Sequence, residues 1–348
     1  MGKSKRKIIL WIIMSVFIGG ISIYAVLGQT KEISFSSIFS TLMTVNKIWI
    51  VAALICMLGF IYFEACAIRQ SCSVLEVDCS VVKCVTYSAA DIYFSAITPS
   101  ATGGQPASAC AMVQDGISVM KTTAALIMNL AMYTVSLIVI GGMCLLTRPK
   151  LFLYFGNISR MLIITGVGVQ LVLASFFILL IKNVRILSFL GEKTIHILKI
   201  LHLIKNEDHS IEKFRSMMEQ YKMCAELFFT RKREIRKILF FNILQRISQI
   251  AVTMCVYIAL GGGLLSGYDL LAMQSFVVLG SNYVPIPGGM GITDYLMLDG
   301  FKGFLTADRA VKLELIARSL SFYFCIIICG LIFLLRIGVI ALKRKVKK

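Results

Sequence analysis

Residues 98–107 read TPSATGGQPA and residues 284–294 read VPIPGGMGITD, and these two stretches decide the fold predicted for the chain. They hold four of the five prolines, and each interrupts an apolar segment that would otherwise read as a membrane helix. Proline removes a backbone donor and glycine loosens a helix, so both stretches leave backbone N–H and C=O groups unpaired. Broken backbone at membrane depth survives only where protein or a water-filled cavity covers it. We therefore expect the working site at these stretches, which we name the first break (98–107) and the second break (284–294).

The composition is that of a membrane protein. The 348 residues are 58% hydrophobic and 16% charged, with a mean hydropathy of +0.83, whereas soluble domains are about 45–50% apolar and about 25% charged. The excess lies in runs of about 20 residues, the length that crosses a bilayer as a helix. The net charge of +18 follows from basic residues at helix ends, as the positive-inside rule requires. We expect contact with anionic lipid rather than nucleic acid as a stable partner.

No metal, cofactor or catalytic motif is predicted. None of the eleven cysteines forms a Cys-x-x-Cys pair, the spacing of Cys72, Cys79 and Cys84 matches no metal site, and the three histidines share one basic loop. Gly103-Gly104 lacks the Lys-Ser/Thr of a phosphate-binding loop. Without an ATP site, any transport would use a gradient or run downhill.

The predicted fold is an all-α polytopic membrane protein in which residues 1–348 form one integral membrane domain. We expect six full transmembrane helices, at 8–27, 47–68, 122–146, 161–181, 238–260 and 313–335. Each break is expected at the tip of a re-entrant hairpin, at 83–116 from the cytoplasm and at 270–305 from the opposite side. Two hairpins of opposite orientation predict an inverted repeat, as in alternating-access transporters.

The distribution of basic residues predicts how the chain is oriented in the membrane. The basic N-terminus, the basic end of the last helix and the basic segment 182–237 predict that both termini lie in the cytoplasm. Apolar residues at helical spacing within 182–237 predict an amphipathic helix that lies on the membrane or packs on the domain. Glu64 is expected at the inner interface, near the end of its helix.

Four ionisable residues lie within membrane segments, where inserting each one costs about 2.5–3.5 kcal/mol of free energy on insertion scales. This cost suggests that they serve a function or pair with other groups. Arg246 and Arg318 could hold a lipid phosphate, since the planar guanidinium pairs two oxygens at once. Asp91 and Asp294 stand beside the breaks and could pair with these arginines or hold an amine of a head group. The alternative to a functional role is a structural one. Glu314 and Arg318 could form an i, i+4 ion pair on their own helix, and the polar residues around Arg246 could serve helix packing. The other predicted site residues lie in the breaks themselves: Thr98, Pro99, Ser100, Gly103, Gly104, Gln105, Pro285, Pro287, Gly288, Gly289 and Gly291.

The motifs TPSxxGGQP at 98–106 and PxPGGxGxxD at 285–294 resemble the lysylphosphatidylglycerol synthase transmembrane-region family, the flippase half of the multiple peptide resistance factor. Many relatives have Glu where this chain has Asp294. Larger members add a soluble domain that transfers lysine from lysyl-tRNA to phosphatidylglycerol. We expect that this chain lacks that transferase domain.

The resemblance implies translocation of phospholipid or aminoacylated phosphatidylglycerol, which protects cells against cationic antimicrobial peptides. The partners implied are anionic or lysylated membrane phospholipids and a separate lipid-modifying enzyme. The alternative is a phosphatidylglycerol lysyltransferase, acting alone or with a soluble partner. A third is a non-transporting regulator that docks through 182–237. The sequence leaves the particular lipid, the energy source and the oligomeric state open.

The predicted topology is testable with reporter fusions. A fusion at residue 35 should report the outside and one at residue 205 the cytoplasm, because the basic loop holds its side of the membrane. Signals from the same side would contradict the topology.

Overall fold

A computed structural model describes residues 45–98, 101–200, 207–289 and 291–346, and every regular element in these ranges is helical. The predicted first helix, 8–27, lies outside the described residues. The elements are α3 (Lys47–Val74), α4 (Val81–Ile97), α5 (Gly104–Gln114), α6 (Val119–Thr147), η2 (Pro149–Tyr154), α7 (Asn157–Lys182), α8 (Val184–Ile200), α9 (Glu207–Thr230), α10 (Lys232–Ala259), α11 (Leu264–Ser281), η3 (Pro287–Gly289), α12 (Ile292–Lys302), α13 (Ala307–Arg318), η4 (Ser319–Phe324) and α14 (Cys325–Val346).

Six stretches in the described part of the chain are long and apolar enough to cross a membrane: α3, α6, α7, α10, α11 and the run Ala307–Ile340. The prediction of an all-α polytopic membrane protein is therefore confirmed. Five of these stretches coincide with predicted full spans. The sixth, α11, coincides with the first arm of the predicted second hairpin.

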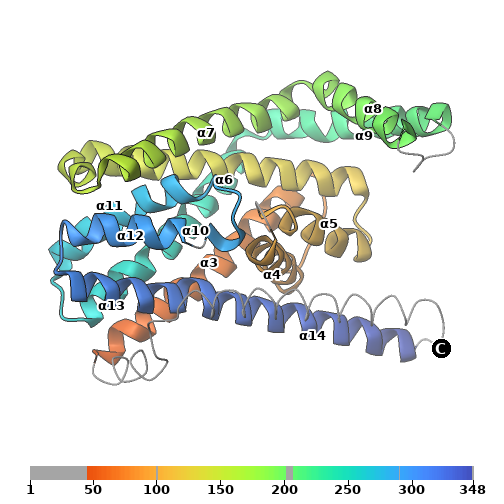
Figure 1. Cartoon of the computed structure of the whole chain (residues 1–348). Helices are drawn as coiled ribbons and strands as arrows, with labels where there is room; N and C mark the ends of the chain where they lie inside the picture. The colour runs from red at the N-terminus through yellow and green to blue at the C-terminus, as the bar shows by residue number, and fades with distance from the viewer. Residues whose placement is uncertain (1–44, 99–100, 201–206, 290, 347–348) are drawn as a thin grey trace.

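The long helices α6, α7 and α14 run along a common direction, which is horizontal in Figure 1, whereas α4 is seen there nearly end-on. Helices α3 and α10 are antiparallel neighbours, because the amide of Asn46 donates to Ala259 O at 3.1 Å while Gln70 at the other end donates to Glu234. We name the end where α3 stops and α10 starts the basic end, since Arg69, Lys83 and residues 231–233 lie there. The other end is the far end.

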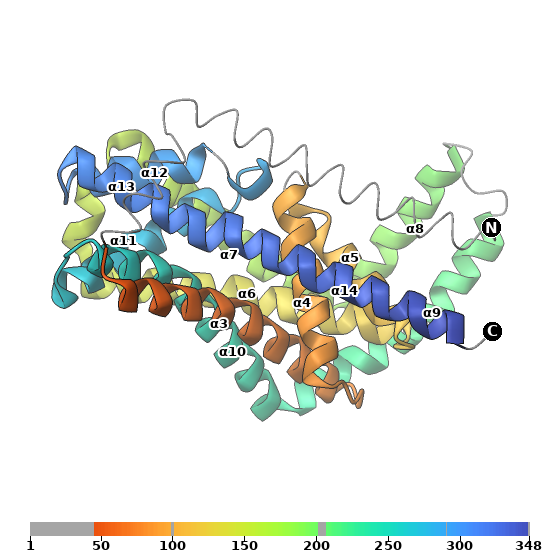
Figure 2. The same ribbon diagram turned by 90° about the horizontal axis from the view of Figure 1, so that it is seen from below.

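The first hairpin starts and finishes at the basic end. Ser80 caps α4, because its hydroxyl accepts from the amide of Lys83 at 3.4 Å. Helix α4 then runs obliquely toward the middle of the bundle, crossing α14 (Figure 2), and α5 returns to Asp115. Neither arm reaches the far end, as expected of a re-entrant hairpin.

The second hairpin starts and finishes at the far end. Helix α11 runs inward until Asn282, whose side chain accepts from Tyr133 in the middle of α6 at 3.1 Å. The chain turns through η3, and α12 runs back to η2, where Asp299 accepts from the amide of Gly156 at 2.7 Å. The two hairpins thus point toward each other from opposite ends, and α4 contacts η3. The inverted repeat itself stays a prediction.

Close helix contacts hold the second hairpin in place. A Cβ on Gly166 of α7 would lie 2.0 Å from Leu279 O in α11, and one on Gly141 of α6 would lie 2.2 Å from the Leu279 side chain. Small residues of this kind let helix backbones approach within a membrane, where packing replaces the hydrophobic effect as the driving force.

Three predicted boundaries are corrected. Helix α10 starts at Lys232, because the basic run before residue 238 is already helical. The last span begins at Ala307 rather than 313, and its middle is one segment of π-helix, η4, so it is not one regular helix. The segment 182–237 holds a helix pair, α8 and α9. The predicted apolar stripe lies on α9, which packs on α6 through buried Met218, Tyr221 and Phe228.

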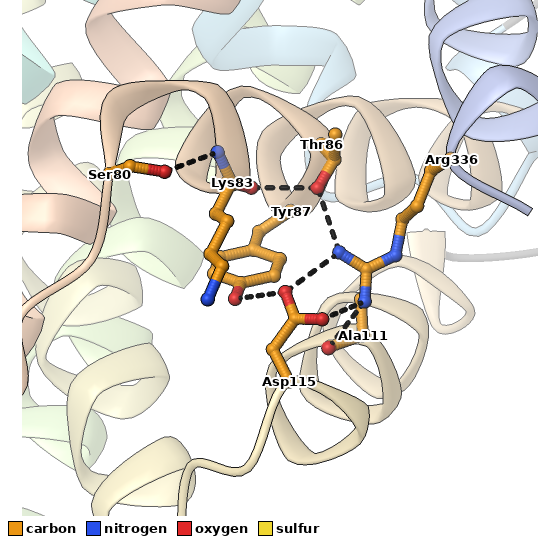
Figure 3. A network of polar contacts seen from close by, with 7 residues as sticks. All are labelled: Ser80, Lys83, Thr86, Tyr87, Ala111, Asp115 and Arg336. Atoms are coloured by element: carbon orange, nitrogen blue, oxygen red, sulfur yellow. Dashed lines mark hydrogen bonds and ion pairs between the residues drawn. The ribbon is translucent and has the colours of Figure 1, made fainter. Parts of the chain in front are cut away.

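Arg336 ties the last helix to the first hairpin (Figure 3). The sequence placed it at the inner end of its span, yet its side chain is only 7% exposed and forms an ion pair with Asp115 at 3.1 Å. The same guanidinium donates to Ala111 O at 2.7 Å and to Thr86 Oγ1 at 2.9 Å. Tyr87 completes the network by donating to Asp115 at 2.6 Å. Both terminal nitrogens of Arg336 and both carboxylate oxygens of Asp115 thus have a partner.

Replacement of Arg336 with Met should lower the free energy of unfolding by about 3–5 kcal/mol, because it leaves a buried carboxylate without its counter-charge. The measurement is chemical unfolding in detergent. Lys312→Met is the matched control, since Lys312 pairs with Asp308 at 2.8 Å but lies 47% exposed, and exposed pairs contribute about 0–1 kcal/mol. Equal losses in the two variants would contradict the structural role of Arg336.

Candidate functional site

Arg246 lies in the middle of α10 and is 6% exposed. Two neutral side chains of its own helix hold the guanidinium, since its Nε donates to Gln245 at 3.3 Å and a terminal nitrogen donates to Gln249 at 2.5 Å. The ring of Tyr133 covers it at 4.1 Å and that of Phe60 at 5.3 Å. The predicted pairing with an aspartate is therefore absent from the contacts described for Arg246, and the charge is held by amides and aromatic faces.

Glu64 is the site residue that sequence reasoning missed. Expected at the interface, it is instead 3% exposed near the middle of α3. It accepts from Asn129 Nδ2 of α6 at 2.8 Å and from Gln245 of α10. It also lies within electrostatic reach of Arg246. A lone acidic residue within an apolar helix was the signal in the sequence, but only the packing of three helices supplies its partners.

A buried polar cluster thus joins the middles of three membrane helices. Asn242 extends it by donating to Asn129 Oδ1 at 3.0 Å. We name these side chains the central cluster: Glu64, Asn129, Asn242, Gln245, Arg246 and Gln249. The predicted polar stripe of α10 therefore does more than bind helices together, because it surrounds two buried ionisable groups of opposite sign. In surroundings of low dielectric such groups interact strongly with any charge brought to them.

Asp91 brings the first break to the edge of the central cluster. Its carboxylate accepts from Gln105 at 3.0 Å, across the break, and from Ser95 at 3.3 Å. Glu64 and Arg246 lie close enough to act on it electrostatically. Asp91 and Gln105, both predicted as site residues, therefore pair with each other beside the central cluster, whereas neither predicted arginine forms an ion pair with Asp91 in the described part of the chain.

The first break satisfies its own backbone. Thr98 donates to Phe94 O at 2.6 Å and accepts from the amide of Gly103 at 2.9 Å, so one hydroxyl replaces the lost helical bonds. Ala101 takes a positive φ of 53°. Gly104 is required by contact: an added Cβ would lie 2.1 Å from Asp91 Oδ1 and 2.5 Å from Asp91 O. Pro99 and Ser100 lie outside the described residues.

The second break is built on left-handed glycines. Gly288, Gly289 and Gly291 have φ values of 61°, 62° and 78°, which side chains on L-residues rarely adopt. Asp294 closes the turn by accepting from the amide of Gly291 at 2.9 Å. Pro285 precedes the turn, and Pro287 begins η3.

Arg318 holds the second break to the last span. Its guanidinium forms an ion pair with Asp294 at 2.8 Å, reaches Gly288 O at 3.4 Å and lies over the Phe322 ring at 4.7 Å. Of the two predicted pairings, the structure has the one across the break rather than the one with Glu314, which is buried on the same helix. The π-helical segment η4, which follows Arg318, contacts α3 and α10. The second break and the central cluster therefore adjoin.

The site combines acceptors for a cation, donors for an anion and two broken hairpins. In the described ranges, no three His, Cys, Asp or Glu side chains gather closely enough to bind a metal ion. Chemically, these side chains offer partners to a ligand that carries both a positive and a negative charge.

Comparison with known families agrees with this architecture. The profile of the family described as Lysylphosphatidylglycerol synthase TM region matches residues 11–329. The chain belongs to this family, and the matched range of residues includes both breaks and the central cluster. Family membership indicates a role connected with membrane lipids. No curated protein matches the chain.

Replacement of Gly104 with Ala should destabilise the protein by about 1–3 kcal/mol, because the new methyl group overlaps the Asp91 backbone and must separate α5 from α4. Gly142→Ala is the control, since a Cβ there meets nothing within 4 Å, and alanine favours a helix by about 0.5–1 kcal/mol. Melting temperatures in detergent measure both. A Gly104→Ala variant as stable as the control would show that the two arms of the hairpin are not in close contact.

Proposed function

We propose that the chain moves a phospholipid head group across the membrane, with the central cluster, Asp91 and the two breaks as its path. The observation that carries the proposal is the position of Glu64, Asp91 and Arg246 where two hairpins from opposite ends meet. Transporters built this way bind substrate at the midplane and use broken helices as moving parts. The family adds the class of substrate, a membrane lipid.

The charges of the site fit a head group that carries both a phosphate and an amine. Arg246 would bind the phosphate through its planar fork, exchanging the Gln249 amide for a charged acceptor. Glu64 and Asp91 would receive the ammonium group. Lysylated phosphatidylglycerol has this combination, and so do other amine-bearing phospholipids. Anionic phosphatidylglycerol would use Arg246 alone.

The physical need for such a site is desolvation. A head group that enters the membrane interior gives up its water, and a buried charge is tolerated there only when it is paired. Prearranged side chains of opposite sign replace the lost water and lower the barrier to crossing.

The last span offers a means of alternating access. Arg318 ties it to the second hairpin and Arg336 ties it to the first. The π-helical segment η4 lies between the two arginines, and single π-turns often occur at functional sites. We propose that release of one pair at a time opens the path first toward one end and then toward the other.

The distribution of basic residues supports an orientation of the chain in the membrane. The basic end would face the cytoplasm of a bacterial inner membrane, with both termini on that side. A separate lipid-modifying enzyme would supply an aminoacylated lipid, and its export would reduce the attraction of cationic antimicrobial peptides.

Arg246→Gln and Asp91→Asn should each slow lipid translocation in proteoliposomes about tenfold or more, because each removes one charge that replaces head-group hydration. Movement is followed with a membrane-impermeant amine reagent on vesicles that contain lysylated phosphatidylglycerol. Arg148→Gln is the control, since Arg148 lies at the far end, where it pairs with Asp269 and its side chain is 47% exposed.

The same preparation separates translocation from lysine transfer. Extracted total lipid is compared with and without lysyl-tRNA. More outer-leaflet label with unchanged total lipid supports translocation. New lysylated lipid, or unchanged transport in both site variants, would overturn the proposal.

A further inference from the structure

Three thiols meet where α3 passes into the first hairpin. Cys72 lies in the last turn of α3, Cys84 in the first turn of α4 and Cys79 in the loop between them. Cys72 and Cys84 both act on the Cys79 thiol, so the three groups lie within electrostatic reach of one another. All three side chains belong to the buried core of the basic end. No role was predicted for this spacing, because the three positions fit no metal motif.

The surroundings of Cys79 favour reactivity of its thiol over those of Cys72 and Cys84. Hydrogen bonds from Cys72 and Cys84 hold the pKa of the Cys79 thiol below its usual range, and Lys83 acts in the same direction. Burial and Asp115 oppose them. Arg69 fixes the loop, because its Nε donates to Cys79 O at 3.1 Å. Positive surroundings of this kind favour the thiolate, which is the nucleophilic form.

A small oxidant can reach Cys79 although only 3% of the residue is exposed. Cys79 lines two cavities at the basic end, of about 410 Å³ and about 460 Å³. Arg69 lines the first and Lys83 the second. A peroxide molecule is little larger than water and fits either cavity.

We propose that Cys79 is a peroxide-reactive residue that closes a disulfide with Cys72 or Cys84. The Cys79 thiolate attacks one peroxide oxygen, the O–O bond breaks, and hydroxide leaves and takes a proton to become water. The sulfur of Cys72 or Cys84 then attacks the resulting sulfenic acid. An S–S bond forms, the S–O bond breaks, and the second oxygen leaves as water with the proton of the attacking thiol. Two thiols lose two electrons, and one peroxide is reduced to two waters.

The disulfide would act on the tether of the first hairpin. A bond between Cys79 and Cys72 fixes the loop to α3, and one between Cys79 and Cys84 fixes it to α4. Either bond removes freedom from residues 75–80, on which any swing of α4 depends. The effect on transport rests on the proposed function, whereas the disulfide itself does not.

The test treats the full chain in detergent with hydrogen peroxide and maps the cysteines by mass spectrometry after alkylation. We expect a loss of two hydrogens at Cys79 paired with Cys72 or Cys84, at a rate at least about tenfold above oxidation of exposed Cys110. Cys79→Ala should abolish the bond. Cys72→Ala should leave only the bond between Cys79 and Cys84.

Cys56 and Cys255 provide an internal control. Their side chains also act on each other electrostatically, yet neither lines any of the three cavities described at the basic end. They should stay reduced. Oxidation of Cys110 or of the Cys56–Cys255 pair before Cys79 would overturn the proposal, and so would a Cys79 that stays alkylatable. These readouts need no transport, so loss of translocation alone leaves the result unchanged.

Discussion

Every polar group placed inside the membrane must find its partner within the protein, and this constraint shapes the whole chain. Two Pro- and Gly-containing breaks interrupt the helices, and each break repairs itself locally. Thr98 replaces the missing helical bonds of the first break. Asp294 and Arg318 do so for the second. The side chains that satisfy the broken backbone are charged or carry a hydroxyl group, so they place polar atoms where the hairpins meet. The need to pair the backbone groups therefore also supplies the polar atoms of the candidate site.

The central cluster obeys the same rule with charges. Arg246 and Glu64 lie within the membrane-spanning part of their helices, and amides from α6 and α10 separate and satisfy them. A direct salt bridge would neutralise both groups at rest. Amide partners instead leave each charge able to exchange its hydrogen bonds for those of a ligand, at little cost in unpaired atoms. This arrangement stabilises the packing of α3, α6 and α10.

The last span connects the two hairpins mechanically. Arg318 holds the hairpin from the far end and Arg336 the hairpin from the basic end, both on one nearly continuous helix. A helix transmits displacement along its axis, and η4 is the one segment between these arginines where the regular bonding pattern changes. The same geometry explains why Arg336 is buried. A cation at the edge of a span usually reaches water, but here α4 and α5 close over it.

The membrane class, five of the described spans, both breaks and the opposite orientation of the hairpins could be predicted from the sequence, because hydropathy and Pro/Gly placement are local properties of the chain. The sequence also marked Asp91, Arg246, Asp294 and Arg318 as charges that needed partners. Only the tertiary structure decided which partners they have: Arg318 with Asp294 rather than Glu314, and Arg246 with amides rather than an aspartate. It also revealed the buried Glu64, the Arg336–Asp115 pair and the thiol cluster. These depend on which helices pack together, and side-chain contacts between helices far apart in the chain leave no periodic signal in one sequence.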